Sequence, residues 1–360
     1  MDQQKRIACL PEALLPWYEM GHRDLPWRHD KEPYHIWVSE IMLQQTRVEA
    51  VRGYYARFLD TLPTISALAD CDDDLLHKLW EGLGYYNRVR NMKKAAQQIM
   101  TEHKGVFPRE YAQVRTLPGI GEYTAGAICS IAFNQPTPAV DGNVLRVISR
   151  ITNDATPIDQ PAYKKFVQQQ LAWIYPHNAG DFTQALMELG ATICGPNRQP
   201  DCENCPCKGF CLGFQRKTAA SLPVKLQKNL RKAEQRTVFI LFCEGKYALK
   251  KRPNRGLLAG LWEFPNVSDK LDTEAAIRAV EGFGLKPRDI LMKVERKHIF
   301  THKEWDMCGV YVEVADCGGD FVWHTAEEIN AHIPLPTAFR LFWEEMKLGE
   351  NDGFFRKNPQ

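Results

Sequence analysis

The sequence predicts two domains, a mainly α-helical domain followed by an α+β domain, and three observations carry this prediction. The chain has 360 residues, of which 44% are hydrophobic and 25% are charged, and at roughly 150 residues per domain this length suits two globular domains. Apolar residues recur at helical spacing early in the chain, whereas its later part is rich in β-forming residues. A basic segment separates the two patterns, so we expect a helical domain at 1–214, a linker at 215–236 and a second domain at 237–350.

The elements of each domain follow from the spacing of the apolar residues. Spacing of three, four and seven residues predicts helices around positions 37–48, 75–82 and 144–151. Beyond the linker, β-rich composition predicts strands at 237–249 and 307–314, and helical spacing predicts a helix at 273–283. No alternating strand pattern stands out before the linker, which favours an all-α first domain.

Charge is nearly balanced over the whole chain but not along it. The 46 Lys and Arg residues against 44 Asp and Glu residues give a net charge of +2, and this composition excludes disordered, collagen-like and coiled-coil proteins. Residues 212–236, however, contain seven basic residues and one acidic residue. This segment is either a solvated tether or a strap along nucleic-acid phosphates.

The expected location is the cytoplasm. No apolar run approaches the ~18 residues of a membrane span, and residues 1–21 lack the apolar core of a signal peptide. We therefore expect a soluble, monomeric protein without membrane contacts, associated with the nucleoid if it is bacterial.

Five of the eleven cysteines lie close together in the sequence. Cys194, Cys202, Cys205 and Cys211 are separated by seven, two and five residues, and Cys207 lies between the last two. In a reducing compartment such a cluster indicates metal ligation rather than disulfides. Four thiolates suit zinc or a 4Fe-4S cluster, and the spacing alone does not separate these two possibilities, because it matches neither ferredoxin pattern.

Three other positions combine candidate chemistry with a structural alternative. The turn Leu117-Pro-Gly-Ile-Gly121 is either a phosphate site built from backbone N–H groups or a plain turn between helices. Asp141 precedes a predicted helix and is either its N-cap or a catalytic acid. Glu40 stands among apolar residues, so it either lies on a polar strip or is buried and kept protonated as a general acid.

Together these motifs resemble the helix-hairpin-helix DNA glycosylases of the endonuclease III superfamily. Residues 37–46 (WVSEIMLQQT), 82–86 (GLGYY) and 141–144 (DGNV) are specifically similar to the adenine DNA glycosylase family, which removes adenine mispaired with 8-oxoguanine. The resemblance covers nearly the whole chain. It implies a substrate of double-stranded DNA with adenine opposite 8-oxoguanine or guanine, and an abasic site as product.

The resemblance also implies the catalytic roles. Glu40 is expected to protonate N7 of the extruded adenine, ionised Asp141 to stabilise the sugar cation, and Tyr123 and Asn143 to position the sugar, the water and Asp141. Bifunctional relatives carry a Schiff-base lysine where this chain has Tyr123. A monofunctional enzyme is therefore expected, and the alternative of a bifunctional pyrimidine lyase needs the missing lysine.

Further residues are expected at the DNA by the same resemblance. Gln45, Thr46 and Tyr85 would enter or contact the duplex, although Tyr85 could instead pack in the core beside Tyr86. The adenine pocket would be lined by Trp27, Arg28 and Leu43. The hairpin residues Leu117, Gly119 and Gly121 would contact the DNA backbone.

The cysteine cluster is implied to hold a 4Fe-4S cluster through Cys194, Cys202, Cys205 and Cys211. The family usually places six residues between the first two cysteines, whereas this chain has seven. The extra residue falls in the loop 195–201, and Cys207 leaves an exchange of ligands open.

The second domain resembles the Nudix-like domain of the same family. Residues 256–265 match the start of a Nudix region, but the acids of the Nudix helix are largely missing from 277–283. We therefore expect recognition of 8-oxoguanine by Phe300, Thr301 and His302, which stand where the family commonly has Phe-Ser-His; His302 could equally be a plain surface histidine. The alternative of a Nudix hydrolase with an added DNA-binding domain needs the missing acids.

Overall fold

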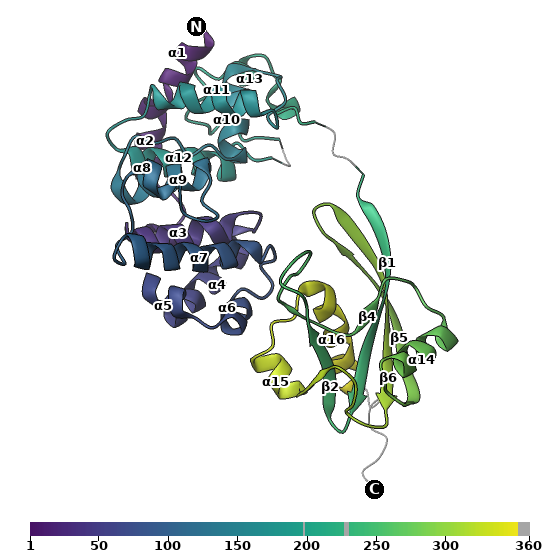
Figure 1. Ribbon diagram of the computed structural model, residues 1–360. Helices are drawn as coiled ribbons and strands as arrows, with labels where there is room; N and C mark the ends of the chain where they lie inside the picture. The colour runs from purple at the N-terminus through teal and green to yellow at the C-terminus, as the bar shows by residue number, and fades with distance from the viewer. Residues whose placement is uncertain (197–198, 227–229, 352–360) are drawn as a thin grey trace. The chain divides into compact units, whose positions relative to one another are not determined.

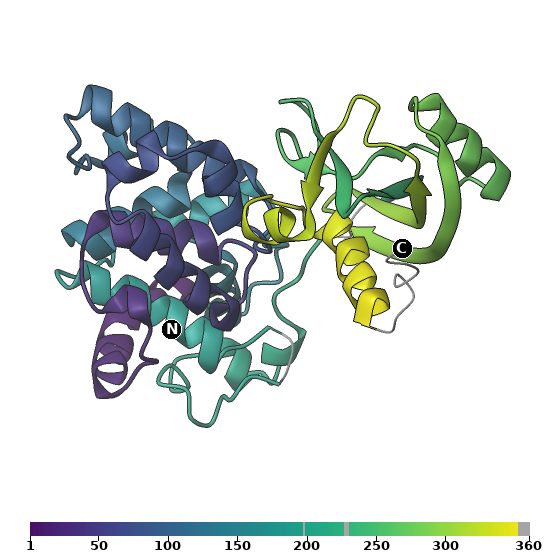
Figure 2. The ribbon, with the colours of Figure 1, turned by 90° about the horizontal axis from the view of Figure 1, so that it is seen from below.

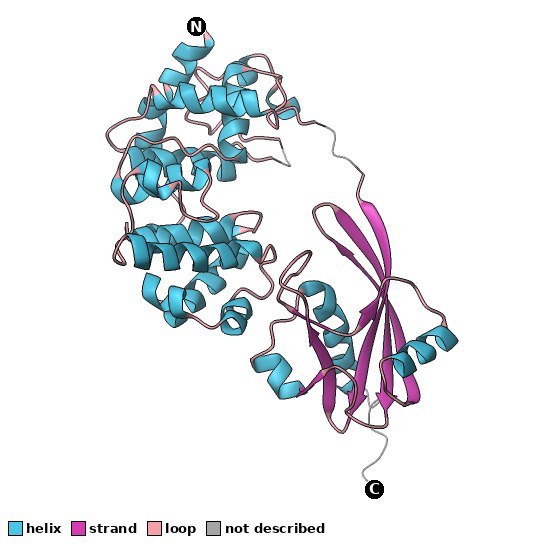
Figure 3. Cartoon of the chain, viewed as in Figure 1, coloured by secondary structure: helices cyan, strands magenta, loops and turns pink. Residues whose placement is uncertain are grey.

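The computed structural model describes residues 1–196, 199–226 and 230–351, which divide into two compact units (Figure 1). The first unit holds residues 1–70 and 90–228, and the second holds residues 71–89 together with the described residues from 230 onward. Every strand of the described residues belongs to the second unit, as Figure 3 shows. The order of an all-α part and an α+β part is thus confirmed.

Helices form the first unit. They are α1 (Gln3–Ala8), α2 (Leu10–Met20), η1 (Pro26–Arg28), α3 (Pro33–Leu43), α4 (Val48–Thr61), α5 (Ile65–Asp70), most of α7 (Asn87–Glu102), α8 (Tyr111–Val114), α9 (Glu122–Phe133), α10 (Gly142–Thr152), α11 (Pro161–Ala172), α12 (Ala179–Thr192), α13 (Leu212–Gln215) and η2 (Ala219–Ser221). Pro33 and Pro161 occupy first-turn positions, where a missing N–H costs nothing. Both α9 and α10 end at asparagines in the left-handed conformation, Asn134 and Asn153.

Two of the three helices predicted before the linker are shorter than their sequence pattern. The pattern at 37–48 is broken because α3 ends at Leu43 and Gln45 adopts a left-handed φ of 62°. Helix α6 (Asp73–Leu79) ends before Gly82, whose φ of 98° is incompatible with a helix. The helix predicted at 144–151 is confirmed within α10.

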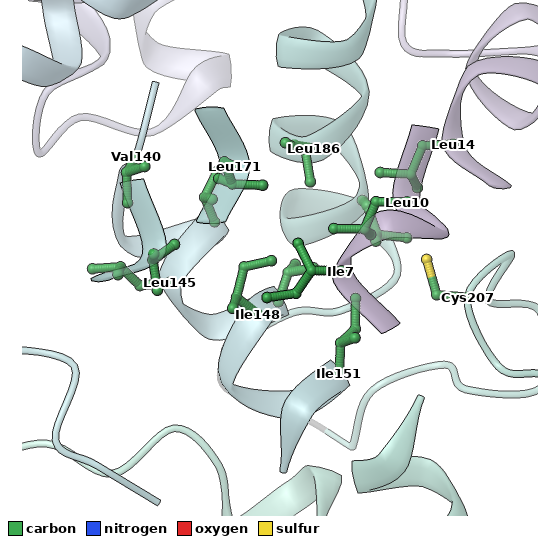
Figure 4. Close-up of a cluster of buried hydrophobic side chains, with 14 of the residues drawn as sticks. Ile7, Leu10, Leu14, Val140, Leu145, Ile148, Ile151, Leu171, Leu186 and Cys207 are labelled. Carbon is green, nitrogen blue, oxygen red and sulfur yellow. The ribbon is translucent and has the colours of Figure 1, made fainter. Parts of the chain in front are cut away.

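Helices α1, α2, α10, α11 and α12 bury one shared core (Figure 4). Ile7, Leu10, Leu14, Ile148 and Leu186 belong to this core and are at most 1% exposed. Cys207 is fully buried in the same core, so the cysteine-rich loop is anchored to the helices by an apolar side chain.

The second unit contains a mixed sheet. Its strands are β1 (Lys232–Cys243), β2 (Lys246–Lys251), β3 (Trp262–Glu263), β4 (Asn266–Val267), β5 (Pro287–Ile299), β6 (Lys303–Val314) and β7 (Val322–Thr325). The main order is β3-β2-β1-β6-β5, with β4 on β1 and β7 on β2. Only the β1–β6 pair of the described ladders is parallel.

Helices cover both faces of this sheet (Figure 2). Along β1, Val238 and Ile240 pack toward α15 (Ala326–Ala331) and α16 (Thr337–Asn351), whereas Phe239 and Leu241 pack toward α14 (Thr273–Gly282). Side chains alternate between the two faces of a strand, and both faces of β1 are covered. The sequence of β1 is therefore continuously apolar from Val238 to Cys243.

The elements predicted for the second domain are found with different lengths. The helix predicted at 273–283 is α14, and the strand predicted at 307–314 lies within the longer β6. The stretch 237–249 is two strands, because Glu244 and Gly245 make a turn between β1 and β2.

The predicted basic linker is shorter than 215–236. Strand β1 begins at Lys232, where its backbone pairs with Lys303 of β6. At the other end, the carbonyl of Leu222 accepts from Arg150 Nε at 2.9 Å, and the carbonyl of Val224 accepts from Ile158 N at 3.0 Å. These residues are therefore fixed to the helical unit and do not form a free tether.

Of the described helices, none has both the length and the apolar character needed to cross a bilayer.

Candidate active site

A cavity of about 570 Å³ in the first unit collects most of the predicted catalytic and pocket residues. Its wall includes Trp27, Arg28, Glu40, Leu43, Gln45, Thr46, Tyr123, Asp141 and Asn143. They come from η1, α3, the α3–α4 turn, α9 and the start of α10, so residues far apart in sequence meet here. Such a volume is typical of a pocket for a small molecule or an extruded base.

Glu40 lies on α3 and is 5% exposed, with its carboxylate toward α9. The Tyr123 hydroxyl donates a hydrogen bond to Glu40 Oε2 at 2.6 Å. Burial raises the pKa of Glu40 to about 7, although the bond from Tyr123 acts in the opposite direction. Glu40 is thus a buried acid near its titration midpoint at neutral pH, and the alternative of a solvated polar strip is wrong.

Asp141 faces the same cavity from the start of α10. Its Oδ1 accepts from Val144 N at 2.8 Å, and its Oδ2 accepts from Asn143 Nδ2 at 2.7 Å. Burial raises the pKa of Asp141, and these two hydrogen bonds oppose that shift. The N-cap and active-site alternatives are therefore compatible, because the carboxylate that caps α10 also lines the cavity.

Sequence reasoning missed Arg146, which holds Asn143 in place. Arg146 Nη2 donates to Asn143 Oδ1 at 2.9 Å and to the Gly190 carbonyl at 2.7 Å, while its Nε donates to the Cys194 carbonyl at 2.8 Å. A chain of hydrogen bonds thus runs from the cysteine-rich loop to Asp141. The signal available in the sequence was an arginine on the apolar face of a predicted helix.

Glu188 was also missed. It is 2% exposed on α12, and its carboxylate accepts from Arg23 Nε at 2.8 Å and from Arg28 Nη2 at 2.7 Å. Burial alone would raise the pKa of Glu188, but the two arginines lower it to about 2. The resulting ion pair fixes Arg28 on the cavity wall, and the sequence signal resembles that of Glu40, a single acid among apolar residues.

One cationic side chain that was not among the predicted site residues also reaches the cavity. Lys164 of α11 lines the wall, together with Gln184 and Met187 of α12. The position equivalent to the lysine of bifunctional relatives is still Tyr123, yet an amine is present at another place on the wall.

The hairpin forms the turn between α8 and α9. Gly119 has a φ of 79°, and a Cβ added there would lie 2.7 Å from Asn91 Cβ, so only glycine fits. Gly121 is the N-cap of α9 and has open space around its Cα. The Leu117 side chain is 2% exposed, so a DNA contact at that position would come from its backbone.

The remaining predicted DNA residues lie in the second unit. Tyr85 is 51% exposed with a φ of 49°, whereas Tyr86 is 5% exposed, so Tyr86 is the one in the core. Thr301 Oγ1 donates to the Tyr85 hydroxyl at 3.2 Å. His302 is exposed, and Phe300 makes an edge contact with Trp305.

The four proposed ligand cysteines line one small apolar cavity. Tetrahedral zinc with Zn–S bonds of 2.3 Å needs sulfurs about 3.8 Å apart. Within the described residues, no three of these sulfurs lie within 4.8 Å of one another.

Cys207 lines the same small cavity as those four thiols. It is fully buried in the α1–α2 core (Figure 4), and its thiol makes a hydrogen bond to Cys205. The proposed ligand Cys211 is buried in the same core, so an exchange of ligands with Cys207 stays open. The predicted extra residue between Cys194 and Cys202 lies in a loop of which positions 197 and 198 are outside the described residues.

Two family models match the chain. Residues 38–172 match the HhH-GPD superfamily of base excision DNA repair proteins, and residues 237–345 match the NUDIX domain. The predicted helix-hairpin-helix and Nudix-like domains are thus confirmed.

Curated relatives and a solved structure agree with these matches. A protein of Arabidopsis thaliana named adenine DNA glycosylase is 38% identical over 74% of this chain and 48% of its own length, so the chain spans about half of that relative. The protein of the same name from Mus musculus is 35% identical over 82% of this chain and 69% of its own. A thermostable thymine-DNA glycosylase superposes with a TM-score of 0.52 and 27% identity, over 59% of this chain and 98% of that one.

Proposed function

Because the chain belongs to the adenine DNA glycosylase family, we propose that it is a monofunctional glycosylase that removes adenine mispaired with 8-oxoguanine or guanine in duplex DNA. The observation that carries this proposal is the pairing of a buried acid, Glu40, and a half-buried acid, Asp141, in one cavity. Glu40, with a pKa of about 7, and Asp141, held by hydrogen-bond donors, line the same cavity in the first unit.

The chemistry follows from the different surroundings of the two acids. An adenine extruded from the duplex, at a cost of a few kcal/mol, would accept a proton on N7 from Glu40, which weakens the bond between N9 and C1′. As that bond breaks, the sugar becomes cationic and the Asp141 carboxylate stabilises it. Water then adds to C1′ and returns a proton to Glu40, which leaves free adenine and an abasic site.

Neighbouring residues would orient these groups. Tyr123 fixes one oxygen of Glu40, and Asn143 fixes Asp141 through Oδ2. Trp27 and Arg28 line the cavity, with Arg28 held by Glu188. None of these steps needs a covalent amine.

The test of the proposal is product analysis with a duplex that contains adenine opposite 8-oxoguanine. Free adenine should appear, and strands should break only after alkali. Because Lys164 reaches the cavity, the Lys164→Met variant is assayed in parallel. Alkali-independent breaks that vanish in this variant would overturn the monofunctional proposal, and the absence of adenine release would overturn the glycosylase itself.

The proposed resident cofactor is a 4Fe-4S cluster held by Cys194, Cys202, Cys205 and Cys211. When bound, the cluster would tie the cysteine-rich loop together and could exchange electrons. Arg150 Nη1 already donates to Cys194 Sγ at 3.2 Å, as suits a thiolate ligand.

Metal analysis of anaerobically purified protein should find about four irons and four sulfides per chain, the content that defines a 4Fe-4S cluster. Cys207→Ser should retain them, because Cys207 is not one of the four assigned ligands. A stoichiometric zinc content without iron would contradict the assignment.

The second unit is proposed to recognise 8-oxoguanine rather than to hydrolyse pyrophosphates. The stretch 277–283 has a single acid, Glu281, which is exposed on α14. Thr301 presents a hydroxyl at the surface, beside the ring of exposed Tyr85.

Thr301→Val is expected to reduce the preference for 8-oxoguanine over guanine opposite the adenine by up to about fivefold, the equivalent of one hydrogen bond of roughly 1 kcal/mol. Valine keeps the shape of threonine and removes only the hydroxyl. The measurement is kcat/KM on the two duplexes, with Thr301→Ser as the matched control that restores the hydroxyl. An equal loss on both duplexes would remove Thr301 from lesion reading.

Gly190→Ala is expected to slow adenine release by at least about tenfold, because its new Cβ would lie 2.7 Å from Asn143 Cβ and displace the residue that orients Asp141. The control is Gly53→Ala in α4, where the nearest atom lies at 3.8 Å. That variant should keep full activity and gain about 0.5–1 kcal/mol of stability. Full activity of Gly190→Ala would show that Asn143 does not need its present position.

A further inference from the structure

A group of thiol and carboxylate side chains in the second unit has no role in the proposed reaction. Cys243 Sγ, a carboxylate oxygen of Glu244 and Cys317 Sγ all lie within 4.8 Å of one another. Among the described residues, no other set of three His, Cys, Asp or Glu side chains is this compact. Cys243 is 2% exposed, whereas Glu244 and Cys317 are at the surface.

Sheet topology brings the two cysteines together. Strands β1 and β6 are parallel neighbours, with Phe242 opposite Glu313. Parallel strands end at the same edge of a sheet, so the last residue of β1, Cys243, lies beside the chain that leaves β6 after Val314. Cys317 belongs to this outgoing loop, and its Sγ approaches the Cys243 carbonyl at 3.7 Å.

Both segments are held in place. Glu244 and Gly245 have φ values of 49° and 76° and form a two-residue turn closed by the pair Cys243–Lys246. On the other side, Trp323 Nε1 donates to the Gly318 carbonyl at 3.0 Å. Three potential ligands are therefore presented from two ordered turns.

The donor set selects the class of ion. Two cysteine sulfurs favour a soft or borderline cation over Mg²⁺ or Ca²⁺, which prefer oxygen ligands. Zinc accepts two sulfurs and one carboxylate oxygen in a tetrahedron, with about 3.8 Å between sulfurs, and leaves one position for water.

We propose that Cys243, Glu244 and Cys317 form a binding site for one thiophilic divalent cation of the zinc class, with water as the fourth ligand. The ion would join the β1–β2 turn to the loop after β6. This site is separate from the cluster of Cys194–Cys211, which lies in the other unit, and it does not depend on the proposed glycosylase activity.

The experiment uses the full chain, reduced with a non-chelating phosphine and with its iron content measured. Zn²⁺ and Cd²⁺ are added to the wild type and to Cys317→Ser, a change at an exposed position. The wild type should bind one ion more per chain, and Cd²⁺ should produce additional ultraviolet sulfur-to-metal absorption that Cys317→Ser lacks. Glu244→Asn, which suits the left-handed turn position but removes the carboxylate, should weaken binding by at least about tenfold.

Controls separate metal binding at this site from effects on folding and from binding at the iron site. Cys9→Ser, at an isolated cysteine of the first unit, should bind as the wild type does, and circular dichroism should show that all variants are folded. Zn²⁺ should raise the melting temperature of the wild type but not of Cys317→Ser. Equal stoichiometry in the wild type and Cys317→Ser would overturn the proposal, as would a Cys243–Cys317 disulfide in freshly reduced, anaerobically handled protein.

Discussion

Glu40→Gln is expected to reduce the rate of adenine release by about 10²–10⁴-fold, the usual contribution of a positioned general acid. The amide cannot deliver a proton to N7, but its carbonyl can still accept the hydrogen bond that Tyr123 donates to Glu40 at 2.6 Å. Binding of the mispaired duplex should therefore change little. Single-turnover kinetics and a binding assay on the same duplex separate the two effects.

The control is Glu49→Gln, at an 82% exposed acid on the neighbouring helix α4. This change should leave the rate unaltered. Near-normal turnover by Glu40→Gln would remove Glu40 from its assigned role.

The pH dependence gives the same acid a second test. Because burial raises the pKa of Glu40 to about 7, the protonated fraction and the rate of base release should fall as the pH rises through 7. The fold should also lose stability between about pH 4.5 and 7, since the unfolded chain releases this proton earlier than the folded one. Glu40→Gln lacks this titration and should be more stable than the wild type by about 3 kcal/mol above pH 7.

Asp141→Asn is expected to reduce adenine release by at least about 10²-fold while keeping the cap of α10. It should lose the hydrogen bond from Asn143 Nδ2, roughly 1 kcal/mol of stability, because an amide NH2 replaces Oδ2. Asparagine caps a helix about as well as aspartate, so the bond from Val144 N can be kept, but the negative charge opposite the sugar cation is lost. Urea unfolding and single-turnover kinetics together measure the two consequences.

Asp141→Ala removes both functions. This variant should be as inactive as Asp141→Asn and should also lose about 1 kcal/mol of stability with the cap of α10. Retention of activity by Asp141→Asn would show that the carboxylate acts only as a cap.

The candidate site could be predicted where its residues stand within local motifs. Glu40 and Asp141 were found because each interrupts or precedes an apolar helix pattern. Arg146 and Glu188 were not found, because their partners at Gly190, Cys194, Arg23 and Arg28 are joined only by the packing of separate helices. Their long-range ion pairs and carbonyl contacts leave no periodic signal in the sequence.

The fold was predicted least well where the backbone conformation differs from the one that the local amino-acid composition favours. Gln45 breaks the pattern of α3 with a left-handed φ of 62° although it is not glycine. Strand β5 (Pro287–Ile299) was missed because its exposed and half-buried residues do not alternate clearly with polarity. The predicted start of β1 lies too late in the sequence, because the charged residues Lys232 and Glu234 were assigned to the linker. In the structure their backbone is paired with β6.

The hydrogen bond from Thr301 to the Tyr85 hydroxyl affects the free energy of the proposed lesion recognition. Because the Thr301 hydroxyl already has a hydrogen-bond partner without DNA, a contact with the lesion would exchange one partner for another. The net gain in binding free energy would therefore be smaller than the roughly 1 kcal/mol of a newly formed bond. Discrimination against undamaged guanine then depends on whether guanine offers Thr301 a hydrogen bond that compensates for the broken Thr301–Tyr85 contact. On undamaged duplex the Thr301–Tyr85 contact would stay formed, so this hydroxyl would add nothing to binding there.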